Sequence, residues 1–349
     1  MKIAVYAIAY NEESNVNQFM NNLKEADMVI VGVDKKTKDN TKKLLKHQGA
    51  KIIDIDVNPW RFDTARNIVL DSIPNDFDVC IALDMDDVIM PGWRQEIEKL
   101  WKPDLTRIRY SYIYTWLDEA KTKPKKIING FKIHRRNNVR WVMPIHEYLE
   151  LPIGEEENEV YTDNIIVNHY QDVKRTRSYL DMIDEAIKTE NNPSWLWYLR
   201  TRQSFYDKKF DLTIESALKF LDMTKSYGTF AEQRSECCRL MAISLFSKKN
   251  NDGQAQLWLM RACSEWPMQK ENWAMLADAW LVMGNYHSAY AAALNAMNCN
   301  DRRFSAEADV YCWDNSYIQN IIDVAYNAMF NRPEKINREA RRKLQKKGK

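Results

Sequence analysis

The chain has 349 residues, more than one comfortable hydrophobic core requires, and this length favours two domains. Hydrophobic residues make up 45% and charged residues 29%, the balance of an ordinary soluble globular protein, and only nine glycines exclude a turn-dense β protein. The net charge is +2, with eight Lys or Arg and one Glu in residues 335–349, and no apolar run approaches the roughly 20 residues of a membrane-spanning helix.

Short apolar runs and helical stretches alternate along the first 90 residues. The run 3–10 is apolar nearly throughout, as expected of a parallel strand covered on both faces, and similar runs follow at 28–33, 52–57 and 79–83. The stretches between these runs carry apolar residues at helical spacing. This alternation predicts a doubly wound, Rossmann-like α/β sheet, in which ligands bind at the carboxyl ends of the strands.

The pattern changes after residue 90. Residues 107–116 alternate strictly, with large apolar or aromatic side chains on one face, and predict a strand. Further short strands are predicted at 130–135, 139–142 and 165–170.

From about residue 176 the chain is nearly all helical. Residues 273–297 have the spacing of a helix–turn–helix repeat of tetratricopeptide type, with Gly284 at the turn, and a similar frame starts 76 residues earlier at Trp197. We therefore predict three regions: an α/β domain at 1–172, an all-α tetratricopeptide-like repeat domain at 173–334 and a basic tail at 335–349.

The six cysteines are not spaced as a zinc site. Because the N-terminal apolar run is too short for a signal peptide, we expect them to be reduced, buried thiols of a cytoplasmic protein. The basic tail has two interpretations: it contacts phosphate or anionic lipid, or it is the solvated end of a helix.

Two carboxylates directly follow the buried run 79–83. In an extended chain Asp84 and Asp86 point to the same side, where they would bind a hard divalent cation. Such a cation neutralises a diphosphate leaving group. The alternative is an acidic turn that precedes the next helix.

Other polar residues end the neighbouring runs. Asp34 would accept the N–H of a nucleobase or cap the following helix, and Asn11 and Glu12 have the same two interpretations. Arg66, on a helix after the third run, would pair with phosphate or lie at the surface.

Four segments together resemble the motifs of family 2 glycosyltransferases with the GT-A fold. They occur in the expected order over about 90 residues: AIAYNEE resembles the first-strand N-E signature, VGVDKKTKDNT the V-V-D-x-x-S-T-D-x-T segment, FDTARN the A-R-N helix and ALDMDD the D-x-D motif. The resemblance implies a nucleotide-diphosphate sugar donor, with a UDP-sugar favoured. It implies donor contacts from six residues: Tyr10, Asn11, Glu12, Asp34, Arg66 and Asp84.

Two further segments extend the resemblance. His169 resembles the histidine after the last strand that supplies a third metal contact, which implies a site of Asp84, Asp86 and His169 for Mn²⁺ or Mg²⁺. WVMPIHE resembles the I-H-E segment of members with a tetratricopeptide-like tail. For His146 and His169 the alternative is a hydrogen-bonded core residue.

An inverting transfer needs a base that removes the acceptor's proton. Glu147 is the first candidate and Asp87 the second, while His146 would orient the acceptor. The Glu-Asp pair that the family often carries on an acceptor-side helix is not found. Lys35 and Lys36 also depart from the family pattern, so the sugar and the nucleobase of the donor stay open.

Two other classes of function remain. One is a non-catalytic nucleotide-binding scaffold of tetratricopeptide type, and the other is a nucleotidyltransferase, which also uses carboxylates and metal. The acceptor of a glycosyltransferase would be a saccharide, a protein or a hydroxymethylated DNA base of a bacteriophage. The helical repeats would support a homo-oligomer or a partner protein.

Overall fold

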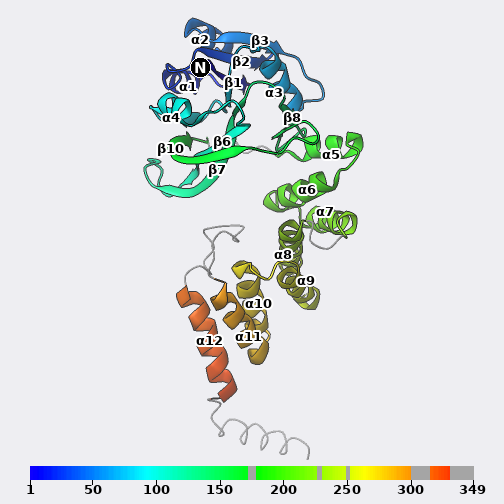
Figure 1. Cartoon of the computed structure of the whole chain (residues 1–349). Coiled ribbons are helices and arrows are strands. Elements are labelled where there is room, and N and C mark those ends of the chain that lie inside the picture. The colour runs from blue at the N-terminus through cyan, green and yellow to red at the C-terminus, as the bar shows by residue number, and fades with distance from the viewer. Residues whose placement is uncertain (172–177, 226–229, 249–251, 300–314, 331–349) are drawn as a thin grey trace, which may run out of the picture. The chain divides into compact units, whose positions relative to one another are not determined.

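The computed structural model describes residues 1–171, 178–225, 230–248, 252–299 and 315–330. The chain divides into two compact units, Met1–Arg177 and Ser178–Lys349 (Figure 1). The basic tail predicted at 335–349 lies outside the described residues.

The first unit is built around an eight-stranded sheet with the strand order β3-β2-β1-β4-β7-β6-β10-β5. Strand β1 pairs in parallel with β2 and β4, and β2 pairs in parallel with β3. The elements of this parallel half are β1 (Ile3–Ala9), α1 (Val16–Asn21), β2 (Met28–Asp34), α2 (Thr41–His47), β3 (Lys51–Ile55), α3 (Phe62–Asp71) and β4 (Val79–Ala82).

The second half of the sheet is mixed. Strand β7 is antiparallel to β4 and β6, while β10 is parallel to β6 and antiparallel to β5. A separate two-stranded sheet pairs β8 with β9. The elements are β5 (Asp87–Ile89), α4 (Trp93–Leu100), β6 (Arg107–Trp116), β7 (Pro124–Arg135), β8 (Arg140–Val142), β9 (Tyr148–Glu150) and β10 (Glu159–His169).

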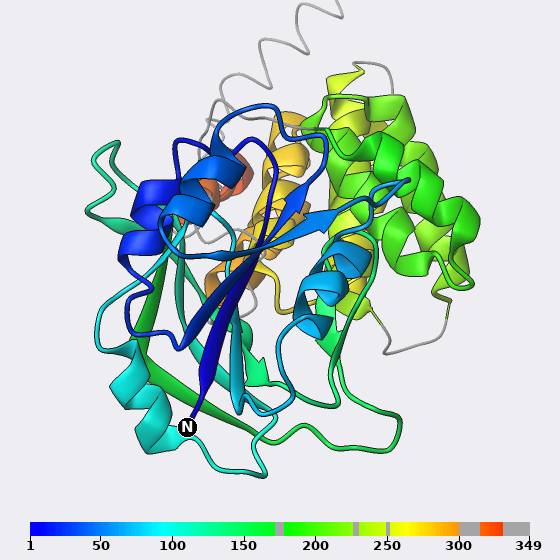
Figure 2. The same cartoon turned by 90° about the horizontal axis from the view of Figure 1, so that it is seen from above.

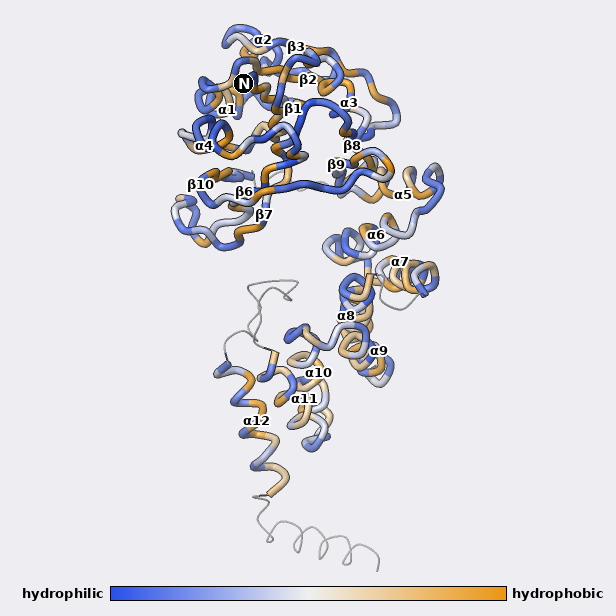
Figure 3. The backbone as a smooth tube through the Cα atoms, in the orientation of Figure 1, coloured by the Kyte–Doolittle hydropathy of each residue, from blue (hydrophilic) through white to orange (hydrophobic). Residues whose placement is uncertain are grey.

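Helices cover both faces of the parallel half, with α1 and α2 on one side of β1 and α3 on the other (Figure 2). Successive strand side chains point to opposite faces. Val5 therefore packs in the same cluster as Phe19 of α1, and Tyr6 in the same cluster as Val69 of α3. Burial on both faces explains the continuous apolar character of β1 and β2, which are largely orange in Figure 3.

In the described part of the second unit, helices pack as consecutive pairs: α6 with α7, α8 with α9 and α10 with α11. Gly284 has φ 74° at the turn between α10 and α11, a conformation that favours glycine. The sequence prediction of an α/β domain followed by tetratricopeptide-like helical repeats is confirmed. The helices are α5 (Leu180–Thr189), α6 (Ser194–Tyr206), α7 (Phe210–Met223), α8 (Ala231–Ser247), α9 (Asp252–Glu265), α10 (Lys270–Val282), α11 (Tyr286–Asn298) and α12 (Asn315–Phe330).

Candidate functional site

The chain turns sharply after β4 and returns to the sheet as β5. The backbone N–H of Asp87 donates to the Asp84 carbonyl oxygen at 3.0 Å, and β5 then pairs with β10 so that Asp87 lies opposite His169. The Tyr170 N–H donates to the Asp86 carbonyl oxygen at 2.9 Å. These backbone contacts bring the end of β10 to the carboxyl end of β4.

Asp86, Asp87 and His169 form a carboxylate–imidazole cluster there. Each offers one ligand atom, and the three atoms lie within 4.8 Å of one another. His169 Nδ1 is 3.0 Å from Asp87 Oδ1 and 3.6 Å from Asp86 Oδ1. Burial above all raises the pKa of Asp86 to about 6. Burial lowers the pKa of His169, but the hydrogen bond with Asp87 and the charge of Asp86 outweigh it and leave that pKa raised.

Asp87 is the most enclosed member of the cluster, with 1% of its surface exposed. Its Oδ1 accepts hydrogen bonds from the Tyr112 hydroxyl at 2.8 Å and from His169 Nδ1 at 3.0 Å, and its Oδ2 accepts from the Asp84 N–H at 2.9 Å. A carboxylate surrounded by donors in this way is suited to orient His169, because the bonded Nδ1 leaves Nε2 as the ligand atom.

Asp84 lies in a different environment from Asp86 and Asp87. Arg66 Nη2 donates to its Oδ1 at 2.5 Å and Lys132 Nζ to its Oδ2 at 2.6 Å. Burial raises the pKa of Asp84, but the charges of Lys132 and Arg66 outweigh it and hold that pKa far below its usual range. Both carboxylate oxygens thus face cations.

The structure therefore groups Asp87, and not Asp84, with Asp86 and His169. The same-side argument for Asp84 and Asp86 assumed an extended chain, whereas the backbone makes a turn between them. Lys132 was missed in the sequence because its role depends on the antiparallel pairing of β7 with β4, which places it beside the strand that precedes Asp84.

Arg66 joins this carboxylate to a second one. It is 2% exposed, its Nε donates to Glu147 Oε1 at 2.5 Å, and its guanidinium lies 5.0 Å from the centre of the Trp141 ring. Its Nη1 is buried and has no hydrogen-bond partner among the described residues. A ligand that brings a hydrogen-bond acceptor into the site would satisfy this nitrogen.

The segment between β8 and β9 places Glu147 on Arg66. Met143 and His146 have positive φ angles, 79° and 53°, which are costly for residues other than glycine. The Phe62 N–H donates to the Pro144 carbonyl oxygen at 2.9 Å and ties the segment to α3. As a result the Glu147 side chain is 12% exposed, while His146 is exposed.

The other predicted donor residues lie at the ends of β1 and β2, which are neighbours in the sheet. Asp34 Oδ1 accepts from the Lys36 N–H at 2.8 Å, so one oxygen closes the turn after β2. Asn11 Oδ1 accepts from the Lys38 N–H at 2.8 Å, and the Glu12 N–H donates to Thr41 Oγ1 at 2.7 Å. Tyr10, half-buried, precedes them.

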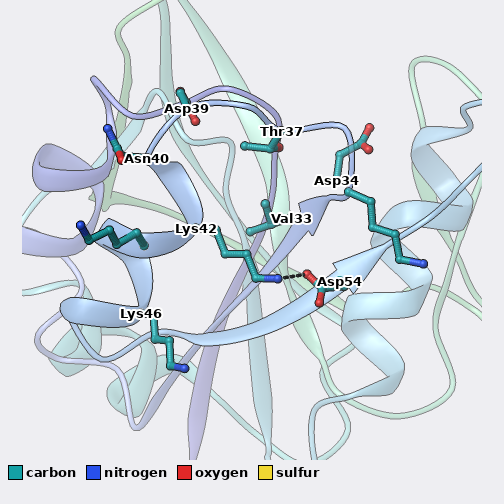
Figure 4. Close-up of a pocket in the computed structure, with 10 residues that line it drawn as sticks. Val33, Asp34, Thr37, Asp39, Asn40, Lys42, Lys46 and Asp54 are labelled. Carbon is teal, nitrogen blue, oxygen red and sulfur yellow. Dashed lines mark hydrogen bonds and ion pairs between the residues drawn. The ribbon is translucent and has the colours of Figure 1, made fainter.

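A hollow of about 580 Å³ adjoins Asp34 on the side of α2 and β3. Lys42 and Asp54 form an ion pair across it at 2.5 Å, and Figure 4 shows the Asp34 carboxylate pointing away from that pair. The residues that line it do not include the carboxylates after β4. They are Val33, Asp34, Lys35, Thr37, Asp39, Asn40, Lys42, Lys43, Lys46 and Asp54.

Comparison with known proteins gives a match to one family model, described as Glycosyl transferase family 2, over residues 4–148. None of the curated proteins matches the sequence. Similar solved structures include that of MamA, at 15% identity and TM-score 0.32 over 46% of this chain and 96% of MamA. Another is the "TPR2B-domain:pHsp70-complex of yeast Sti1", at 15% identity and TM-score 0.29 over 40% and 98%. A third is 4-diphosphocytidyl-2C-methyl-D-erythritol synthase from Anaerococcus prevotii, at 10% identity and TM-score 0.27 over 39% and 70%.

Proposed function

Residues 4–148 belong to glycosyl transferase family 2, and from this premise we propose that the protein is a metal-dependent, inverting glycosyltransferase. It takes the sugar from a nucleotide-diphosphate sugar, with UDP as the favoured nucleotide, and transfers it to a hydroxyl group. The observation that supports this most is the Asp86–Asp87–His169 cluster, which lies beside the Arg66–Lys132 cation pair at the carboxyl end of β4.

The charges of the site suit a divalent cation. Four carboxylates, those of Asp84, Asp86, Asp87 and Glu147, lie together with two permanent cations, Arg66 and Lys132. With His169 neutral, the excess of two negative charges equals the charge of one Mn²⁺ or Mg²⁺. The Asp86 carboxylate and His169 Nε2 would hold the ion, and this set of ligands suits Mn²⁺ as well as Mg²⁺. When bound, the ion would neutralise charge on the diphosphate.

The protein's own side chains would position the acceptor and remove its proton. In the transfer, the acceptor oxygen forms a bond to the anomeric carbon while the bond from that carbon to the diphosphate breaks. We assign the released proton to the Glu147 carboxylate, which Arg66 keeps in place. Asp87 suits this role less, because it is buried and its oxygens accept three hydrogen bonds. His146, exposed beside Glu147, would contact the acceptor.

The donor nucleotide would lie along the ends of β1, β2 and β4. The second carboxylate oxygen of Asp34 would accept from the base, while Tyr10, Asn11 and Glu12 would line or brace the loop that follows β2. The unpartnered Arg66 Nη1 supports a place for Arg66 near the nucleotide. We include Asp84 as a donor contact on the same ground, since Arg66 holds it at this edge.

The hydroxyl that we propose as acceptor belongs to a saccharide, a protein or a hydroxymethylated DNA base of a bacteriophage. Among the described residues no helix has both the length and the apolarity to cross a membrane. The five cysteines that the structure describes are buried and free, which supports our proposal of a cytoplasmic location. For the helical repeats we propose self-association or a partner protein.

Calorimetric titration with nucleotide diphosphates and their sugars, with and without Mn²⁺, tests the proposal. We expect one nucleotide to bind in a metal-dependent manner, and the Asp86→Asn variant to keep its fold but lose that dependence. Release of pyrophosphate from a nucleoside triphosphate would instead indicate a nucleotidyltransferase. Binding without any turnover of nucleotide sugars would favour the scaffold.

A further inference from the structure

An aromatic row on β6 lies beside the cluster of Asp86, Asp87 and His169. Tyr110, Tyr112, Tyr114 and Trp116 alternate along the strand, and β6 is the parallel neighbour of β10. The Tyr112 and Tyr114 ring centres each lie 5.8 Å from that of His169, and Tyr114 stacks on it with an interplanar angle of 3°. The Trp116 Nε1–H donates to the His169 carbonyl oxygen at 2.8 Å.

Within this row Tyr112 has a contact that its neighbours lack. Its hydroxyl donates to Asp87 Oδ1 at 2.8 Å, the same oxygen that lies 3.0 Å from His169 Nδ1. Tyr112 is buried, so water does not compete for this hydrogen bond. By contrast, the buried hydroxyl of Tyr110 makes no hydrogen bond to the carboxylates or the imidazole of the cluster among the described residues.

We propose that Tyr112 is a positioning residue for the metal site: its hydroxyl orients Asp87, and Asp87 in turn orients His169 for the ion. This inference rests on the proposed function. Tyr112 does not itself face the ion or the sugar, and its contribution passes through the Asp87 carboxylate.

The physical argument concerns the freedom of the Asp87 carboxylate. The Asp84 N–H fixes Oδ2, and Tyr112 supplies a fixed donor for Oδ1. Without the hydroxyl, Oδ1 is held only by His169, and rotation of the carboxylate would carry the imidazole with it. Partners of this kind, one step removed from a metal, typically contribute tenfold to a hundredfold in metal affinity or activity.

The test is Mn²⁺ binding to the full chain, followed by electron paramagnetic resonance of free Mn²⁺, and it needs no turnover. We expect Tyr112→Phe to weaken Mn²⁺ binding about tenfold or more. Tyr110→Phe, which removes a neighbouring buried hydroxyl that does not hydrogen-bond to the cluster, should bind Mn²⁺ as the wild type does. In transfer assays the Mn²⁺ concentration for half-maximal activity should rise for Tyr112→Phe, while kcat at saturating Mn²⁺ stays close to the wild-type value.

A double-mutant cycle separates positioning from a general structural effect. If Tyr112 acts through Asp87, then Tyr112→Phe should cause no further loss of Mn²⁺ affinity in the Asp87→Asn background. Additive losses, or wild-type affinity in Tyr112→Phe alone, would overturn the proposal. Failure of the wild type to bind Mn²⁺ would remove the proposed metal dependence itself, and with it the site that Tyr112 is proposed to position.

Discussion

The hydrogen-bond chain through His134 predicts a specific acid sensitivity. His134 is fully buried on β7, and its Nδ1 lies 2.6 Å from the Arg135 carbonyl oxygen, which can only accept, so Nδ1 carries a proton. Its Nε2 lies 2.8 Å from the Tyr6 hydroxyl, and the Tyr6 oxygen accepts from the Trp141 Nε1–H at 2.7 Å. The chain is satisfied when Nε2 accepts from Tyr6, which requires neutral histidine.

Burial, the main cause, lowers the pKa of His134 to about 3 from its usual 6.5. The unfolded chain therefore binds a proton below pH 6.5 that the folded chain does not bind until pH falls near 3, and stability decreases as pH falls through this window. Each pH unit within it costs about 1.4 kcal/mol. At pH 5 the free energy of unfolding should have lost about 2 kcal/mol through this residue alone.

The variant His134→Gln removes the titrating group and keeps a polar side chain. Stability is best followed by hydrogen exchange of peptides from β1 and β7, because the two units need not unfold together. Between pH 7.5 and pH 5 the wild type should lose about 2 kcal/mol more than His134→Gln. Equal losses in the two proteins would refute the neutral, hydrogen-bonded state of His134.

Three further changes have outcomes that the contacts predict. Arg66→Met leaves the partly buried Glu147 without its cation and should lower the free energy of unfolding by about 3–5 kcal/mol in the same exchange measurement; a loss below about 1 kcal/mol would mean that the pairs are solvated. Glu147→Gln should lower kcat by about a hundredfold or more while calorimetry shows unchanged donor affinity; unaffected transfer would remove Glu147 as the base. Gly130→Ala sets a Cβ against the Tyr110 ring and should cost about 1–3 kcal/mol by thermal denaturation, whereas Gly253→Ala, with open space around it on α9, should be neutral or stabilising.

The strand ends were predictable because burial on both faces gives β1, β2 and β4 a continuous apolar character in the sequence. Carboxylates that directly follow such strands can be recognised in the sequence without knowing which strands pair with one another. Asp34 and the carboxylates after β4 were found in this way, and doubly wound topology places them at one edge.

Contacts that depend on the mixed half of the sheet were not predictable. Lys132 contacts Asp84 because β7 pairs antiparallel with β4. Tyr112 contacts Asp87 because β10 has β6 as its neighbour on one side and β5 on the other, so the side chains of β6 and β5 meet across this one strand. Alternation within a strand shows which residues share a face, but it does not show which strand lies next to it. The turn after Asp84 was only the alternative interpretation of its segment, because the hydrogen bond that closes it is made by the backbone and leaves no side-chain pattern in the sequence.

The position of β10 has a consequence for the order of folding. It is the last strand that the structure describes in its unit, yet it pairs with β6 about fifty residues earlier and brings His169 to Asp86 and Asp87. Such long-range pairing is slow, because chain entropy is lost before the contacts form. During synthesis the cluster therefore stays incomplete until residue 169 has emerged, and acquisition of the ion would mark the moment at which the sheet closes.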